Sequence, residues 1–355
     1  LYITELNEDV RSVKGKAVKI WEGGFKNAHE LGGGYGMEGA HMYKINGKYY
    51  ITCPAGGTEG WQICLRSDKI YGPYEHKLIM YDDSSYPKNG LHQGGMVQLK
   101  NGDWWFMIMQ DRGPIGRVPC LVPVTWVDGW PMLGDNGKDL ITYPKPNVGK
   151  QSKIKSPDTS DEFNSLKLGL QWQWNHNPDD DNWSVTENPG YYRIRTGRLS
   201  ANVYGAKNSL TQRAYGPHCV SETKINVAGL NPGDYAGLCA FQDSYGIIGV
   251  TCDKDGRKYI IQGEGKFDEQ DDGFYNKVPV NENERVSEPL EADEVCVKIE
   301  YDFSYTATTI ADKADFYYST DNGITWIKLG KQLNVTNDYT TVFMGARSYL
   351  FMYST

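Results

Sequence analysis

A glutamate flanked by glycines has the setting of an acid catalyst. Glu38 lies in the segment 32–41, where glycines on both sides free the backbone and leave room for a ligand near the carboxyl group. Apolar and aromatic neighbours in this segment would desolvate the carboxyl group, and desolvation raises the pKa of a carboxylic acid. A general acid must hold its proton near neutral pH, so this setting favours acid catalysis. The alternative is a solvated glutamate at the entrance to a strand.

A histidine and an arginine occupy comparable places further along the chain. His92 lies in the glycine-containing segment 89–95, just before a predicted strand, as Glu38 lies just before its own. Arg117 opens the next predicted strand, where a guanidinium could hold a sugar hydroxyl or orient a carboxylate. The alternatives are a turn histidine bonded to the backbone and an arginine in a surface ion pair.

The elements that must position these residues have the sequence pattern of β-hairpins. Asn46-Gly47 and Asn101-Gly102 each separate two runs of strand composition, and Asn-Gly is a strong hairpin signal. Each hairpin is followed by a further predicted strand, residues 62–66 and 117–126, and then by a Gly/Pro turn. A repeat of roughly 50 residues with three or four antiparallel strands is typical of propeller blades. Two ordinary hairpins in one sandwich are the alternative.

The propeller interpretation brings the candidate residues together. The innermost strands of a propeller line its central channel, so we expect Glu38 and His92 to converge on one pocket. Only two full blades fit before residue 150, whereas a propeller needs about four or more to close. We therefore expect further blades outside this sequence.

The second half of the chain differs in charge and pattern. Residues 1–155 carry a net charge of +3 and the remainder −11. We predict a propeller part over residues 1–150, a Pro/Lys/Ser-rich linker over 151–157 and a β-sandwich over 158–355. Residues 263–294 are acidic and predicted to be a loop. The sandwich strands are predicted at residues 191–195, 218–225, 236–242, 246–252, 295–301, 314–319 and 343–353.

Composition excludes several classes of protein. The chain has 355 residues, of which 39% are hydrophobic, and no apolar run is long enough for a membrane helix. A net charge of −8 argues against nucleic-acid binding. The seven cysteines contain no CxxC pair and are predicted to be mostly buried thiols, with a Cys53–Cys64 disulfide as the alternative. No nucleophile elbow or phosphate loop is present in the sequence.

Long motifs in both halves resemble glycoside hydrolase family 43, in its two-domain xylosidase/arabinofuranosidase group. The matching segments of the first half are Met37–Tyr50, His92–Val97, Asp103–Trp105, Gln110–Gly113, Gly116–Pro119 and Pro123–Pro131. Those of the second half are Phe163–Ser165, Leu168–Pro178, Ala236–Leu238 and Tyr245–Val250. The resemblance covers almost the whole chain.

The resemblance implies an all-β protein with part of a five-bladed β-propeller followed by a concanavalin A-like β-sandwich. It assigns Glu38 as the general acid of an inverting glycosidase, in which a second carboxylate activates water. It places His92 close to the sugar, or to a metal or water in the channel, and Arg117 on the substrate; His41 and Gln93 complete the expected substrate-binding residues. No cofactor is expected to be required, although a structural calcium is an open alternative.

The resemblance also implies residues that this sequence does not contain. It puts the aspartate base and an acid-tuning aspartate before Leu1, and one more strand after Tyr353, so we expect a longer protein. The predicted function is exo-acting release of xylose or arabinofuranose from an oligosaccharide or polysaccharide such as xylan, arabinoxylan or xyloglucan. A non-catalytic carbohydrate-binding β-protein is the alternative. An extracytoplasmic location is favoured, and the oligomeric state is open.

Overall fold

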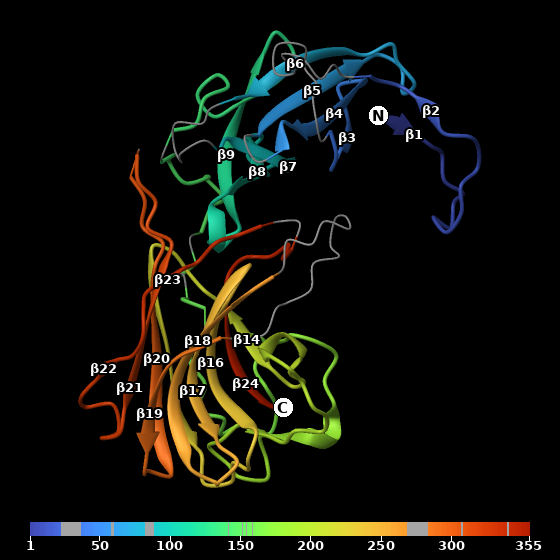
Figure 1. Ribbon diagram of the computed structural model, residues 1–355. Coiled ribbons are helices and arrows are strands. Elements are labelled where there is room, and N and C mark those ends of the chain that lie inside the picture. The colour runs from blue at the N-terminus through green and yellow to red at the C-terminus, as the bar shows by residue number, and fades with distance from the viewer. Residues whose placement is uncertain are drawn as a thin grey trace. The chain divides into compact units, whose positions relative to one another are not determined.

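A computed structural model gives the fold of the chain (Figure 1). It describes residues 1–22, 37–57, 60–81, 89–140, 142–150, 152–153, 155–157, 159–267, 283–306, 308–338 and 341–355, with backbone alone at 283–285. The described residues form antiparallel strands and short 3-10 helices at Gly113–Ile115, Asp180–Asn182 and Val203–Gly205. The chain is therefore all-β, as predicted.

The chain divides into two compact units. The first contains Leu1–Arg112, Arg117–Lys153 and Thr306–Thr308, and the second contains Gly113–Gly116, Ile154–Tyr305 and Thr309–Thr355.

Two four-stranded antiparallel sheets form most of the first unit. The first has the order β3-β4-β5-β6 and the second the order β10-β9-β8-β7. A short strand pair, β1 with β2, precedes them. Each sheet has the strand number and antiparallel meander of a propeller blade. The strands are β1 (Tyr2–Ile3), β2 (Val18–Lys19), β3 (His41–Ile45), β4 (Lys48–Ala55), β5 (Trp61–Ser67), β6 (Glu75–Met80), β7 (Leu91–Gln98), β8 (Trp104–Asp111), β9 (Arg117–Val127) and β10 (Trp130–Leu133).

The two predicted hairpins form, but with different turns. Ile45 lies opposite Lys48, so Asn46 and Gly47 alone connect β3 to β4, with φ of 49° and 83°. This is the left-handed pair that a type I′ turn requires. In the second hairpin Gly102 N donates to Leu99 O at 3.0 Å, and only Gly102 has a positive φ, 95°. That connection is longer and needs glycine at one position instead of two left-handed residues.

Apolar side chains from both sheets pack into one core. Strand β4 lies beside β7, and β6 beside β10. Tyr50 and Cys64 of the first sheet share a buried cluster with Phe106, Ile108 and Val122 of the second. A separate cluster around Ile63 and Trp61 lies within the first sheet. The two sheets are thus held together as neighbouring blades.

The second unit is a sandwich of a seven-stranded and a five-stranded sheet, visible face to face in Figure 1. The larger sheet has the order β11-β14-β24-β16-β17-β18-β19; the smaller has β15-β20-β21-β22, with β23 also paired to β21. The strands are β11 (Gln173–Trp174), β12 (Trp183–Ser184), β13 (Arg193–Ile194), β14 (Leu210–Arg213), β15 (His218–Asn226), β16 (Asp234–Phe241), β17 (Ser244–Cys252), β18 (Lys258–Lys266), β19 (Asn283–Leu290), β20 (Glu294–Asp302), β21 (Lys313–Ser319), β22 (Ile327–Lys328), β23 (Leu333–Asn334) and β24 (Arg347–Ser354).

The loop predicted over residues 263–294 is wrong at both of its ends. Strand β18 continues to Lys266, and Asn283–Leu290 forms β19 at the edge of the larger sheet. Acidic residues suppressed the strand signal, because an edge strand tolerates charged side chains that a central strand would exclude. Residues 268–282 of the predicted loop lie outside the described residues.

The main core of the sandwich lies between its two sheets. Leu238 and Ile248 of the larger sheet pack in one buried cluster with Val297, Ile299 and Phe316 of the smaller. These residues alternate with residues on the outer faces, which is the pattern of a sandwich. A second buried cluster, rich in aromatic rings, lies around Phe241 and Tyr349 of the larger sheet.

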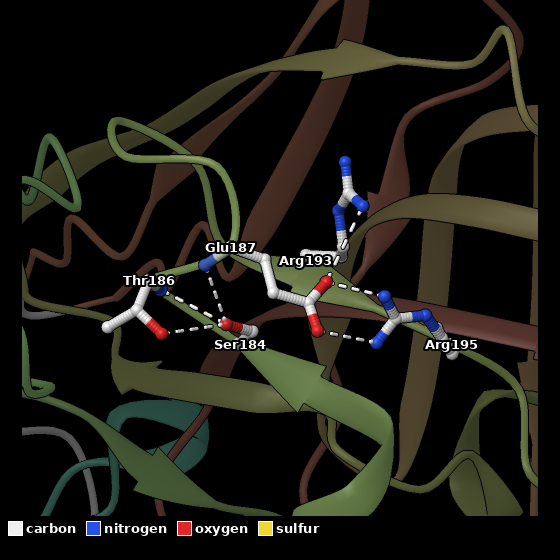
Figure 2. A network of polar contacts seen from close by, with 5 residues as sticks. All are labelled: Ser184, Thr186, Glu187, Arg193 and Arg195. Carbon is white, nitrogen blue, oxygen red and sulfur yellow. Dashed lines mark hydrogen bonds and ion pairs between the residues drawn. The ribbon is translucent and has the colours of Figure 1, made fainter.

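A small hairpin of the second unit is closed by the polar network in Figure 2. The Ser184 hydroxyl accepts from the backbone N–H groups of Thr186 and Glu187, both at 3.0 Å. The Glu187 carboxylate contacts the guanidinium groups of Arg193 and Arg195, and Arg195 lowers the pKa of this carboxyl group. The single Glu187 carboxylate is therefore shared by two guanidinium groups in the hairpin of β12 and β13.

All seven cysteines are free thiols, which confirms the main cysteine prediction and not the Cys53–Cys64 disulfide. Burial raises the pKa of the Cys53 thiol to about 12. In the part of the chain that the structure describes, no helix has the length and apolarity needed to cross a membrane.

Candidate active site

The predicted site residues are all described and all lie in the first unit. Glu38 precedes β3, and His41 is the first residue of that strand; both are exposed. His92 and Gln93 lie near the start of β7, and Arg117 is the first residue of β9. His92 is buried, with 4% of its surface exposed, while Gln93 and Arg117 are half-buried.

A β-bulge at Gln93 shapes the centre of the site. The pairing of β7 with β8 shifts between His92 and Gly94, which leaves Gln93 outside the register with a φ of 56°. Its backbone N–H donates to the side-chain oxygen Oε1 of Gln62 at 2.8 Å, and Gln62 is fully buried in β5. At Gly94 a Cβ would lie 1.9 Å from the Met107 carbonyl oxygen, so glycine permits the close approach of β7 and β8. The bulge redirects Gln93 relative to an ordinary strand residue.

The Gln93 side chain lies between the segment of Glu38 and the strand of Arg117. Its oxygen Oε1 accepts from Arg117 Nη1 at 3.2 Å. Its nitrogen Nε2 lies 2.7 Å from the position of a Cβ on Gly39, the residue that follows Glu38 and has a φ of 56°. Any side chain at Gly39 would therefore collide with Gln93.

A buried aspartate that sequence analysis did not select lies between His92 and Arg117. Asp111, at the end of β8, is 1% exposed. Its Oδ2 lies 3.3 Å from His92 Nε2, and its Oδ1 lies 3.4 Å from Arg117 Nε. The only sequence signal for it was its place in the motif Gln110–Gly113, because cross-strand contacts depend on register.

Charges around His92 link it electrostatically to Glu38. Burial lowers the pKa of His92, and Arg117 adds to that effect; the Gly90 carbonyl, Asp111 and Glu38 act in the opposite direction. The printed contacts place Gln93 beside both Gly39 and Arg117, and Asp111 beside both His92 and Arg117. The convergence of Glu38 and His92 on one pocket stays a prediction.

The described residues leave Glu38 exposed, so they do not supply the apolar cover expected from the sequence. Most of the glycine- and tyrosine-containing segment before it, residues 23–36, lies outside the described residues. The exposed carboxyl group can meet a ligand directly.

The two ring nitrogens of His92 lie close to protein oxygens. His92 Nδ1 lies 3.2 Å from the Gly90 carbonyl oxygen, and Nε2 faces Asp111, so each ring nitrogen already faces a protein acceptor. Across the described ranges, no three His, Cys, Asp or Glu side chains are arranged to hold a metal ion.

Family models match both units. Residues 1–131 match the model of glycosyl hydrolases family 43, and residues 160–355 match the beta xylosidase C-terminal concanavalin A-like domain. The second match covers more than half of the chain.

Individual relatives agree with these matches. The chain is 35% identical over 277 residues to a beta-xylosidase of Formosa agariphila, covering 65% of this chain and 46% of the relative. It is 32% identical to a non-reducing end alpha-L-arabinofuranosidase of Bacteroides ovatus, covering 59% of this chain and 42% of that protein. A solved structure described as a bifunctional GH43-CE protein of Bacteroides eggerthii is 37% identical, with a TM-score of 0.78, and the match covers 100% of this chain and 43% of the other. The chain therefore spans less than half the length of these relatives.

Proposed function

Because the chain belongs to glycoside hydrolase family 43, we propose that its protein is an inverting, exo-acting glycosidase with Glu38 as the general acid. The observation that supports this most is the position of Gln93, which contacts Arg117 and lies beside Gly39, the residue that follows the exposed Glu38; Arg117 in turn contacts the buried Asp111. An acid catalyst must reach the ligand, whereas the groups that orient the ligand need fixed positions, which buried contacts provide.

The proposed reaction divides the work between two carboxyl groups. Protonated Glu38 donates its proton to the glycosidic oxygen as the bond to the sugar breaks. A carboxylate outside this sequence accepts a proton from the water that attacks the opposite face of the sugar. In inverting enzymes the two carboxyl groups lie about 6.5–9.5 Å apart, which leaves room for this water. Arg117, with its side chain 36% exposed, would donate hydrogen bonds to sugar hydroxyls.

The substrate class follows from the names of the relatives. They are named a beta-xylosidase and a non-reducing end alpha-L-arabinofuranosidase, so we propose a terminal xylosyl or arabinofuranosyl unit of plant hemicellulose as the substrate. Removal of a single terminal sugar is the exo action that the second name describes.

Substitution of the acid tests the proposal in the full-length protein. Glu38→Gln removes the proton but keeps the shape of the side chain, so kcat on xylo- or arabino-oligosaccharides should fall about 10²–10⁴-fold. Nitrophenyl glycosides should lose much less, because nitrophenolate needs little protonation to leave. NMR of the fresh product should show the inverted anomer. Near-wild-type turnover of the oligosaccharides by the variant would contradict the assignment, and sugar binding without turnover by the wild type would support the binding-protein alternative.

A further inference from the structure

We propose that Asp111 is a positioning residue of this site, whose buried carboxylate fixes the Arg117 guanidinium, and with it the sugar, relative to Glu38. The inference rests on the proposed function and assigns a role to a residue that the acid mechanism does not itself use. It deepens that function by naming what holds the substrate-binding arginine in place.

The position of Asp111 follows from the register of two strands. Asp111 lies directly opposite Arg117 in the pairing of β8 with β9. Directly opposite side chains share one face of the sheet, so the carboxylate and the guanidinium meet across the strands. The bulge in β7 brings the third partner, His92, to the same carboxylate.

The backbone around Asp111 has supports that do not use the carboxylate. Asn89 Nδ2 donates to the Asp111 backbone carbonyl at 2.7 Å, and Gln110 Nε2 donates to the Asn89 carbonyl at 2.9 Å. Strand pairing continues on both sides of β8. The end of β8 is therefore placed by amide contacts, while the buried carboxylate acts on two side chains of the candidate site.

The charge of Asp111 has a cost that this role would explain. Removing a carboxylate from water is unfavourable unless it is paired, and such pairs rarely increase stability over an uncharged core. Here the carboxylate meets Arg117 at Nε, the nitrogen nearest the chain, while Nη1 contacts Gln93 Oε1. The ion-pair contact at Nε and the hydrogen bond at Nη1 together restrain the plane of the guanidinium.

The substitution Asp111→Asn tests this role in the full-length enzyme because the amide keeps the size of the side chain and removes its charge. With Arg117 less ordered, KM for the oligosaccharide should rise and kcat/KM should fall about 10- to 100-fold. The matched control is Asp103→Asn, which neutralises an exposed aspartate in the turn before β8 and should leave both constants unchanged.

A double-mutant cycle separates positioning from a structural role. In an Arg117→Ala background the arginine is absent, so Asp111→Asn should cause little further loss in kcat/KM. If Asp111→Asn lowers kcat/KM by the same factor with and without Arg117, the inference is overturned. Arg117→Lys keeps the positive charge but lacks the Nε contact, so it should raise KM as Asp111→Asn does. This second variant tests the role even if Asp111→Asn does not fold.

Failure of the proposed function has a different signature. A wild-type protein that hydrolyses no glycoside overturns both proposals. An active wild type together with an unaffected, folded Asp111→Asn variant overturns only the positioning role.

Discussion

The two four-stranded sheets of the first unit are built alike but present their site residues differently. Glu38 lies ahead of the first strand of its sheet and is exposed, whereas His92 lies inside the first strand of the other and is buried. A group that transfers a proton must reach the ligand, while a group held by Asp111 and the Gly90 carbonyl can keep a fixed position. Under the proposed function, comparable places in the two sheets would serve reaction in one and alignment in the other.

The first strands of the two sheets also differ by a bulge, which β7 has and β3 lacks. The pairing of β3 with β4 runs without a register shift from His41 to Ile45. In β7 the extra residue, Gln93, turns toward Arg117 and Gly39. The two hairpins therefore differ by one inserted residue, which the buried Gln62 holds and whose side chain contacts Arg117.

The largest expected effect comes from crowding the buried imidazole. At Gly60, with a φ of 49°, a Cβ would lie 2.0 Å from His92 Nδ1. Gly60→Ala should therefore displace the ring, reduce kcat/KM and cost about 1–3 kcal/mol more than backbone strain alone. Urea unfolding and kinetics of the full-length variant measure both effects.

Gly57 provides the matched control for this substitution. Its φ is 58°, and no atom of the described residues lies within 4 Å of a Cβ built there. Gly57→Ala should cost only the strain of a left-handed residue, about 1–2 kcal/mol, and leave kinetics unchanged. Equal effects at Gly57 and Gly60 would show that His92 is not held as described.

Loss of the amide that anchors the bulge should have the next largest effect. Gln62→Met keeps the volume of the side chain but leaves the Gln93 backbone N–H without its acceptor, which should cost about 1–3 kcal/mol. The loosened Gln93 should also raise KM, because its side chain contacts Arg117. Ile63→Val, in the same buried strand, is the control. It should lower the free energy of unfolding by about 0.5–1.5 kcal/mol and leave KM unchanged.

Acid should reveal the burial of His92. Burial lowers the pKa of His92 in the folded protein, so the unfolded chain binds its proton more tightly. The stability that depends on neutral His92 is present above the unfolded pKa of about 6.5 and is lost as pH falls below it. Replacing His92 with asparagine should make this part of the pH dependence smaller, as measured by urea unfolding from pH 8 to pH 5. An unchanged pH dependence would contradict the burial of a neutral imidazole.

The sequence was sufficient to predict those features of the fold that depend on local residue patterns. The Asn46-Gly47 turn, the repeated hairpins and the change to a sandwich all follow from residue types and spacing. The role of Asp111 and of Gln62 did not follow, because both depend on register and on the left-handed conformation of Gln93, a residue type that gives no such signal. Strand β19 was missed because its edge position permits the charges that indicated a loop. The roles expected of the five site residues stay predictions: Glu38 as the acid, and His92, His41, Gln93 and Arg117 as substrate-binding residues.

The smallest expected effect lies in the turns, where the two sheets are most alike in sequence. In the part of the chain that the structure describes, no atom lies within 4 Å of a Cβ built at Gly47 or at Gly102, and their φ values are 83° and 95°. Alanine at either position should therefore cost about 1–2 kcal/mol through backbone strain alone, with no change in kinetics. Urea unfolding of the two variants would compare these costs directly.

A third substitution distinguishes the two turn types. Asn46 also has a positive φ, 49°, so Asn46→Ala should destabilise the first hairpin by about 1 kcal/mol, because asparagine tolerates this conformation better than alanine. Lys100, in the second turn, is exposed and does not have a positive φ, so Lys100→Ala should have almost no effect. Equal losses for Asn46→Ala and Lys100→Ala would mean that the two hairpins share one turn geometry, and that the sheets differ only in the bulge of β7.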